Sequence, residues 1–169
     1  MLRSSFCGSR FTRPIPMLNR DFKEFVELLN SNGVEYLVVG GYALAAHGHP
    51  RYTGDIDIWL DPSPTNVKRL LKALREFGFG SVGLSEADFQ QPGAIVQLGY
   101  PPARIDLLSS IDGVQFAECY PRRKVVSVSG AELPILHLDD FRANKLASGR
   151  AKDLADLESL DTPPEPDPN

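Results

Sequence analysis

The sequence predicts a small α+β domain: a mixed β-sheet with helices packed on it and helices at the C-terminal end. Helical and strand-like patterns alternate through the first half of the chain, strand-like runs dominate residues 94–136, and two helical patterns follow. With 169 residues, 42% of them hydrophobic and 24% charged, the chain has the length and composition of one domain with its own core.

The expected domain covers residues 17–160. Residues 1–16 contain arginines and serines but no acid, and are predicted to be a disordered extension, with a targeting segment as the alternative. Residues 161–169 are rich in proline and aspartate and are predicted to be a flexible tail. Cys7 and Cys119 fit neither a disulfide framework nor a zinc site, which favours free thiols in a reducing compartment, and we expect a cytoplasmic protein.

The net charge of -4 excludes a protein that is cationic overall and clamps nucleic acid through that charge. A local basic groove remains open, because a small-molecule phosphate needs only a few cations. No apolar run approaches the roughly 18 residues of a membrane-spanning helix, so no membrane span is predicted.

Three elements are predicted before the first acidic strand. Apolar residues at helical spacing predict an amphipathic helix over residues 19–31. Valine and leucine crowd residues 34–40, which predicts a short buried strand that stops at glycine. The alanine-rich run 42–48 predicts a short helix closed by Gly48 and Pro50.

The middle of the chain predicts a strand, a helix and a strand pair. Residues 55–60, DIDIWL, alternate apolar and other side chains, which predicts a strand with both carboxylates on one face. Residues 63–78 predict a helix, because Pro64 suits its first turn and apolar side chains line one face. The runs 94–99 and 104–110 predict two strands joined by a hairpin-like return.

The last third predicts two strands and two helices. Residues 123–136 carry strand-like runs on either side of Ser129 and Gly130. Residues 138–148 and 150–160 follow helical patterns and are separated by a glycine, which predicts two helices.

Asp55 and Asp57 carry the strongest chemical signal. Two positions apart on a strand, their side chains leave the same face about 6.5–7 Å apart at the backbone, where like charges repel. Divalent cations would offset that repulsion, since a two-metal phosphoryl-transfer site holds ions about 3.5–4 Å apart between carboxylates. Asp106, flanked by apolar residues, is the candidate third ligand. The alternative is an exposed edge strand whose charges deter aggregation.

Other residues near this strand are candidates for binding phosphates. Gly40 and Gly41 lie between a strand and a helix, where backbone N–H groups can meet a phosphate without a side chain in the way. Arg51 would neutralise a triphosphate or form a plain salt bridge with an acid, and both readings stay open. His47 and His49 are spaced poorly for joint metal binding, which favours a loop lining the site.

Three stretches resemble one known superfamily. GGYALAAHGHPRYTGDIDIWL, residues 40–60, resembles the signature of the DNA polymerase beta-like nucleotidyltransferases: Gly-Gly or Gly-Ser, about a dozen residues, then D-x-D. RIDLLSS, residues 104–110, looks like the strand that carries their third carboxylate. NKLASGRAKDLADLESL, residues 144–160, is similar to a helical motif of the abortive-infection toxin and related bacterial stand-alone nucleotidyltransferases.

The resemblance implies a nucleotidyltransferase fold and an enzyme that moves a nucleoside monophosphate from an NTP to a hydroxyl with two Mg²⁺ or Mn²⁺ ions. Asp55 and Asp57 would bind both ions, and Asp106 would bind the ion that activates the acceptor. The acceptor stays open between an RNA end, a protein side chain and a small molecule. A protein partner or a homo-oligomer is also open.

The resemblance also assigns roles outside the three acids. Gly40 and Gly41 would cradle the triphosphate. Lys145 would be a cation near the phosphates, with Asp153 orienting the lysine or the nucleotide and Asp156 supporting it. From the residues alone, these helical charges would be read as surface ion pairs.

One position departs from the pattern. The family often has serine where this chain has Gly41, so backbone amides or Thr53 would have to replace its hydroxyl in nucleotide binding. This departure leaves a second function open: a catalytically weak or inactive nucleotide-binding module, such as a toxin–antitoxin component.

Overall fold

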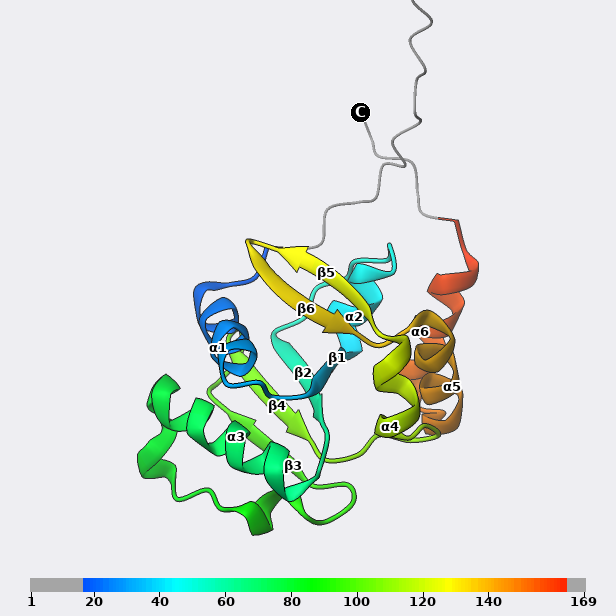
Figure 1. The fold of residues 1–169 in the computed structure, drawn as a ribbon. Coiled ribbons are helices and arrows are strands. Elements are labelled where there is room, and N and C mark those ends of the chain that lie inside the picture. Colours follow the sequence, from blue (N-terminus) through cyan, green and yellow to red (C-terminus); the bar gives the residue numbers. More distant parts are fainter. Residues whose placement is uncertain (1–16, 164–169) are drawn as a thin grey trace, which may run out of the picture.

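The computed structural model describes residues 17–163, which form one six-stranded mixed sheet with helices on both sides (Figure 1). The expectations for residues 1–16, and for all but the first three residues of 161–169, lie outside this described range. Within it, no helix combines the length and the apolar character that crossing a membrane requires.

The elements match the predicted order. The strands are β1 (Tyr36–Val39), β2 (Asp55–Leu60), β3 (Ile95–Leu98), β4 (Arg104–Leu108), β5 (Lys124–Val128) and β6 (Ala131–Ile135). The helices are α1 (Arg20–Ser31), α2 (Gly40–Ala46), α3 (Pro64–Leu74), α4 (Phe116–Cys119), α5 (Leu138–Ser148) and α6 (Ala151–Asp161). The predicted α+β class with a mixed sheet and C-terminal helices is confirmed.

The sheet order is β3-β4-β2-β1-β6-β5, which places the acidic strand β2 near the centre. β2 pairs antiparallel with β1 and parallel with β4. The register sets Asp57 beside Asp106 on one side and beside Val39 on the other. Because paired residues of neighbouring strands point to the same face, the side chains of Asp57 and Asp106 project together.

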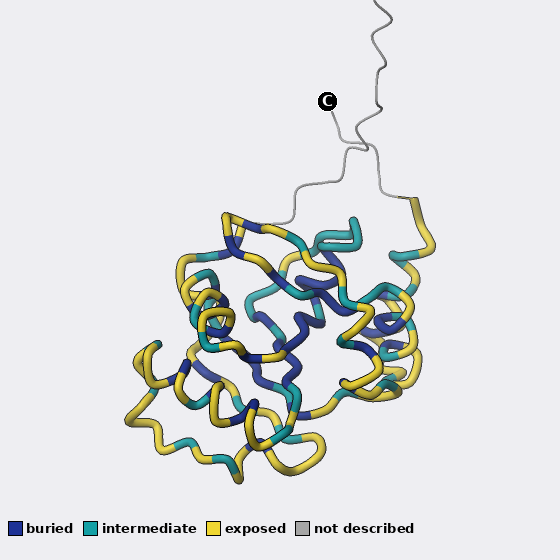
Figure 2. The backbone as a smooth tube through the Cα atoms, in the orientation of Figure 1, coloured by how far each residue is buried: buried dark blue, intermediate teal, exposed yellow. Residues whose placement is uncertain are grey.

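The two faces of β2 have different environments. Ile56 and Ile58 are fully buried on the apolar face. On the acidic face, Trp59 packs edge-on against Phe116 of α4, with ring centroids 5.2 Å apart. Figure 1 shows α1 and α3 on one side of the sheet and α4, α5 and α6 on the other. Figure 2 shows that the buried backbone is concentrated in the central strands and in the helix segments that face them.

Local sequence signals explain the helix starts. The Asn19 side chain accepts the Phe22 N–H at 2.8 Å and caps α1. Ser63 caps α3, and Pro64 occupies its first turn. Gly149, in the left-handed region at φ 64°, ends α5 and lets the chain turn back into α6.

Two details differ from the sequence prediction. The helix expected over residues 63–78 is regular only to Leu74 and then widens to π geometry, which Gly78 interrupts at φ 107°. The short helix α4 was not predicted, because four residues are too few to show a helical period. Its Phe116 and Cys119 nevertheless pack into the core.

Candidate metal and nucleotide site

Three carboxylates converge on the acidic face of the sheet. Asp55 and Asp57 come from β2 and Asp106 from β4, and each offers a ligand atom within 4.8 Å of the other two. We call these three residues the triad. Asp106 is buried, whereas the two β2 acids remain partly exposed, so the triad is open to solvent on one side. Hard oxygen ligands converging from rigid strands are the donor set that Mg²⁺ or Mn²⁺ prefers.

The electrostatics of the triad favour a bound cation. Burial raises the pKa of Asp57 to about 6, and the charges of Asp55 and Asp106 add to the rise. Burial also raises the pKa of Asp106. The positive charges of Lys152 and Lys145 act on Asp57 in the opposite direction. The crowded negative charge is therefore only partly offset, and a divalent ion would relieve it.

Thr53 holds the first acid of the triad. Its hydroxyl lies 2.8 Å from Asp55 Oδ1 and 3.0 Å from the Asp55 carbonyl oxygen, and its single proton can go to either. Burial would raise the pKa of Asp55, but hydrogen bonds from Thr53 and Arg104 outweigh it and lower that pKa. The Thr53 hydroxyl thus orients Asp55, in addition to the nucleotide contact predicted for it.

Arg104 is a site residue that the sequence analysis missed. Its Nε and Nη2 donate to the two carboxylate oxygens of Asp106 at 2.9 and 3.1 Å, and Nη2 also donates to Asp55 Oδ2 at 2.8 Å. The signal was available: Arg104 lies two residues before Asp106 on the same strand and therefore on the same face. A cation in that position predicts an ion pair within the triad.

Glycine is required at position 40 because a side chain there would collide with the triad. It begins α2 at φ 65°, and a Cβ there would overlap Asp57 Oδ2. Gly41 is enclosed as well: a Cβ would lie 3.1 Å from Thr53 Cβ and 3.3 Å from a guanidinium nitrogen of Arg51. The space of the serine expected from the family is therefore bordered by Thr53 and Arg51.

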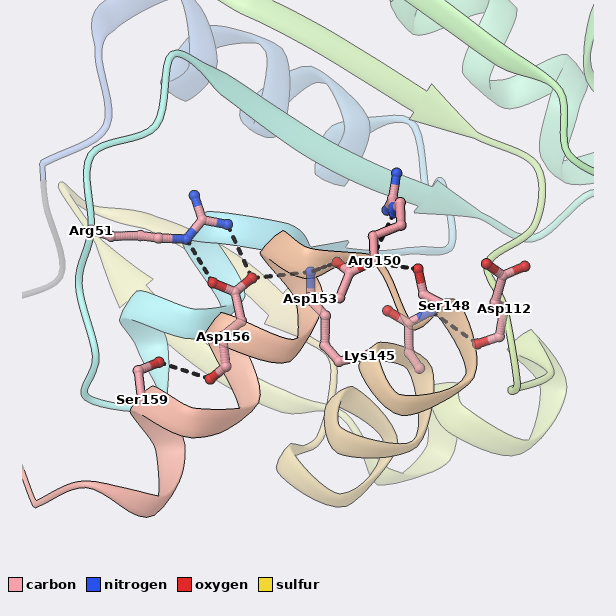
Figure 3. Close-up of polar contacts among 9 residues, drawn as sticks. Arg51, Asp112, Lys145, Ser148, Arg150, Asp153, Asp156 and Ser159 are labelled. Carbon is pink, nitrogen blue, oxygen red and sulfur yellow. Dashed lines mark hydrogen bonds and ion pairs between the residues drawn. The ribbon is translucent and has the colours of Figure 1, made fainter.

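The predicted cation Lys145 lies in a buried network of charges between α5 and α6 (Figure 3). Its Nζ is 3.0 Å from Asp153 Oδ1 and 3.2 Å from Asp156 Oδ2, and its side chain is only 8% exposed. Arg51, in the loop before β2, donates two hydrogen bonds of 3.0 and 3.2 Å to the carboxylate of Asp156. The salt bridge with an acid, one of the two alternatives expected for Arg51, is therefore present. Its predicted contact with a triphosphate stays a prediction.

Asp153 is held by three donors in this network. It accepts hydrogen bonds from Lys145, from Ser148 at 2.6 Å and from Arg150 at 2.8 Å. Burial would raise the pKa of Asp153, but these donors hold it well below its usual range. Asp153 thus fixes the position of Lys145, and its predicted role in nucleotide binding stays a prediction.

A cavity of about 390 Å³ adjoins this network. Its lining combines the apolar side chains of Leu44, Pro50 and Ala155 with the charged pair of Arg51 and Asp156. The loop of residues 48–50 thus borders this cavity. His47 lies elsewhere, with Nε2 2.8 Å from the Leu136 carbonyl oxygen.

A known protein family matches this chain over most of its length. The model of a family described as nucleotidyltransferases of unknown function (DUF6036) matches residues 17–162. The chain belongs to this family. The match spans the whole sheet, the triad and both C-terminal helices. No curated protein matches the chain at a significant level.

Solved structures share the fold of this DUF6036 member. A Thermotoga maritima protein, assigned provisionally as a nucleotidyltransferase, is 19% identical with a TM-score of 0.57 over 82% of this chain and 89% of its own. An antigenic nucleotidyltransferase-like protein from Paracoccidioides brasiliensis is 17% identical, with a TM-score of 0.50 over 82% and 72%. The lincosamide antibiotic adenylyltransferase LnuA, with lincomycin bound, is 12% identical, with a TM-score of 0.50 over 86% and 98%. At these identities the likeness shows the fold, and the abortive-infection subtype stays a prediction.

Proposed function

We propose that this protein is a divalent-metal-dependent nucleotidyltransferase that moves a nucleoside monophosphate from an NTP to a hydroxyl acceptor. The observation that carries the proposal is the triad, whose ligand atoms from two parallel strands lie within 4.8 Å of one another. Membership of a nucleotidyltransferase family supports the same reaction class. The acceptor hydroxyl would lose its proton to solvent as its oxygen bonds to the α-phosphorus, the bond from that phosphorus to the bridging oxygen would break, and pyrophosphate would leave.

The acids of the triad would bind the metal ions, and the glycines beside them would bind the triphosphate. Asp55 and Asp57 would bind two Mg²⁺ or Mn²⁺ ions, and Asp106 would bind the ion next to the acceptor. Bound there, these ions lower the pKa of the acceptor hydroxyl and stabilise the leaving oxygens. Gly40 keeps the space beside Asp57 free of a side chain, so that with Gly41 it would bring backbone N–H groups to the triphosphate.

The charges around Lys145 would complete the phosphate site. Arg51, Lys145 and Arg150 supply three positive charges against the two of Asp153 and Asp156, so the network keeps a net positive charge. That surplus favours an anionic triphosphate beside the triad. The side chains are held in place before substrate arrives, which lowers the entropic cost of binding.

Replacing both β2 acids tests the proposal. Asp55→Asn with Asp57→Asn should abolish transfer of labelled nucleotide from NTP and leave the circular dichroism spectrum unchanged. The matched control is Asp139→Asn with Asp161→Asn, since both side chains are more than 70% exposed and lie outside the site. Unchanged incorporation by the Asp55/Asp57 double variant would overturn the proposal. The acceptors to screen are RNA ends, protein hydroxyls and small molecules. The small molecules should include a lincosamide, because LnuA is named as a lincosamide antibiotic adenylyltransferase.

A second function is favoured by two observations: Arg104 already pairs with two of the three acids, and Gly41 supplies no hydroxyl. The protein would then bind nucleotide without turning it over, as a regulatory module or a toxin–antitoxin component. Calorimetry with Mg-ATP and a pyrophosphate assay separate the two functions. Binding without pyrophosphate release on any acceptor selects the regulatory module, and release selects the enzyme. We place either form in the cytoplasm, following the free-thiol prediction.

A further inference from the structure

We propose that Arg104 is an internal stand-in for the divalent cation: it holds the triad together in the metal-free protein and must leave Asp55 and Asp106 before a metal ion binds. This inference rests on the proposed function only in taking the triad as the metal site. It concerns a residue that neither the family resemblance nor the sequence motifs single out.

The hydrogen bonds of Arg104 occupy the oxygens that a metal would need. Both carboxylate oxygens of Asp106 accept from it, and so does Oδ2 of Asp55, at 2.8 to 3.1 Å. Oδ1 of Asp55 accepts from the Thr53 hydroxyl. Within residues 17–163, Asp57 accepts no hydrogen bond on its carboxylate, although it lies between Gly40 and the other two acids. The guanidinium therefore covers two ligands of the triad and leaves the third free.

A guanidinium can be removed from these oxygens in one way only. It does not lose its proton in proteins, so the site cannot be freed by titration of Arg104. The side chain has to move. Arg104 is the first residue of β4 and its side chain is 30% exposed, so it borders solvent into which a long, flexible chain can turn.

The same contact explains how the metal-free fold tolerates the triad. Three carboxylates this close repel one another, and one cation hydrogen-bonded to two of them offsets much of that repulsion. Arg104 thus stabilises the metal-free protein and, for the same reason, weakens the binding of a free divalent ion. A metal ion that arrives with the anionic nucleotide would meet a smaller net barrier, because the phosphates offer Arg104 a new partner.

A competing role makes the opposite prediction. If Arg104 only holds the carboxylates in the right orientation, its removal would loosen the ligands and weaken metal binding. The stand-in role predicts tighter binding after removal. The sign of the change in metal affinity therefore distinguishes the two roles.

The experiment is a calorimetric titration with Mn²⁺ alone, without nucleotide, on the full chain. Arg104→Gln should bind Mn²⁺ roughly three- to tenfold more tightly than the unaltered protein. It should also melt at a lower temperature in EDTA and regain that loss in Mn²⁺. The matched control is Arg122→Gln, because Arg122 makes a similar two-bonded fork on Asp140, at 2.7 and 3.1 Å, away from the triad. That control should leave Mn²⁺ affinity unchanged.

Equal or weaker Mn²⁺ binding by Arg104→Gln would overturn the proposal. If this variant does not fold, Arg104→Lys serves instead: it keeps the charge but cannot form the fork, and should bind Mn²⁺ with intermediate affinity. Affinity equal to that of the unaltered protein would again overturn the stand-in role. Failure of every form to bind Mn²⁺ removes the metal site and the proposed function with it. Equal binding by all forms removes the Arg104 proposal alone.

Discussion

Two clusters of the same residue types lie on the same side of the sheet, and their charges are balanced differently. In the network of Lys145, Asp153 and Asp156, buried acids are matched by fixed cations. In the triad, three acids share the single cation Arg104 among the described side chains within ion-pair distance. The balance of charge decides which ion each cluster attracts: the network keeps a small positive surplus and would favour an anion, whereas the triad keeps a negative surplus and would favour a cation.

The largest effect should come from breaking the matched network. Lys145→Met would leave Asp153 and Asp156 buried with one cation fewer, which should lower the free energy of unfolding by about 3–5 kcal/mol. Urea denaturation measures it. Lys152→Met is the matched control, because that lysine on α6 is exposed and should change stability by less than about 0.5 kcal/mol. Similar losses of unfolding free energy in the two variants would show that the burial of Lys145 does not determine its contribution to stability.

Gly40 joins the triad to the start of α2, and its replacement should have the next largest effect. Gly40→Ala introduces a Cβ that overlaps the Asp57 carboxylate, at a positive φ that alanine disfavours. We expect a loss of about 2–3 kcal/mol in unfolding free energy, together with weaker Mn²⁺ binding.

Gly48→Ala is the control for this prediction. Gly48 also has a positive φ, of 96°, but its Cβ would meet open space, so only the backbone term of about 1 kcal/mol should appear. Mn²⁺ affinity should not change. If both variants lose the same stability and the same affinity, contact with Asp57 is not the reason for glycine at position 40.

The unmatched charge of the triad should appear as a pH dependence of stability. Burial and the neighbouring acids raise the pKa of Asp57 to about 6, above its value in the unfolded chain. The folded state therefore prefers the protonated acid, and this stabilisation, complete below the unfolded pKa, is lost as pH rises through about 6. Asp57→Asn removes the loss and should make the metal-free protein more stable at pH 7 by about 1–3 kcal/mol.

Unfolding of both proteins from pH 4 to pH 7 in EDTA tests this. The advantage of Asp57→Asn should grow with pH and should shrink or reverse when Mn²⁺ is added, because the unaltered carboxylate then gains a ligand. An advantage that is constant across the pH range would show that the charge of Asp57 is not responsible.

The sequence predicted those parts of the molecule that depend on local pattern. Alternation along residues 55–60 was enough to place Asp55 and Asp57 on one face, and the apolar residues that flank Asp106 were enough to propose it as their third partner. The start of α3 near Pro64 was equally local. These features need no knowledge of the rest of the chain.

The pairings between distant segments could not be read in the same way. The fork of Arg51 on Asp156 joins residues 105 positions apart, and nothing in either stretch selects that partner over another acid. Arg104 differs, because its position two residues before Asp106 on the same strand already places it on the face of the triad. Charge balance within a predicted site is therefore information that the sequence already holds.

The smallest expected effect tests whether Thr53 fills the space that a serine at position 41 would need. Gly41→Ser should cost about 1–2 kcal/mol, since its Cβ would lie 3.2 Å from the Thr53 methyl carbon. Thr53→Ser keeps the hydroxyl on Asp55 and removes that methyl, so Gly41→Ser should cost less by about 0.5–1 kcal/mol in this background. Urea unfolding of the four proteins measures the coupling, and an equal cost of Gly41→Ser in both backgrounds would show that the two positions are independent. A coupling of the expected sign would mean that the Thr53 methyl group occupies space that a side chain at position 41 needs, which links the glycine at that position to the residue that holds Asp55.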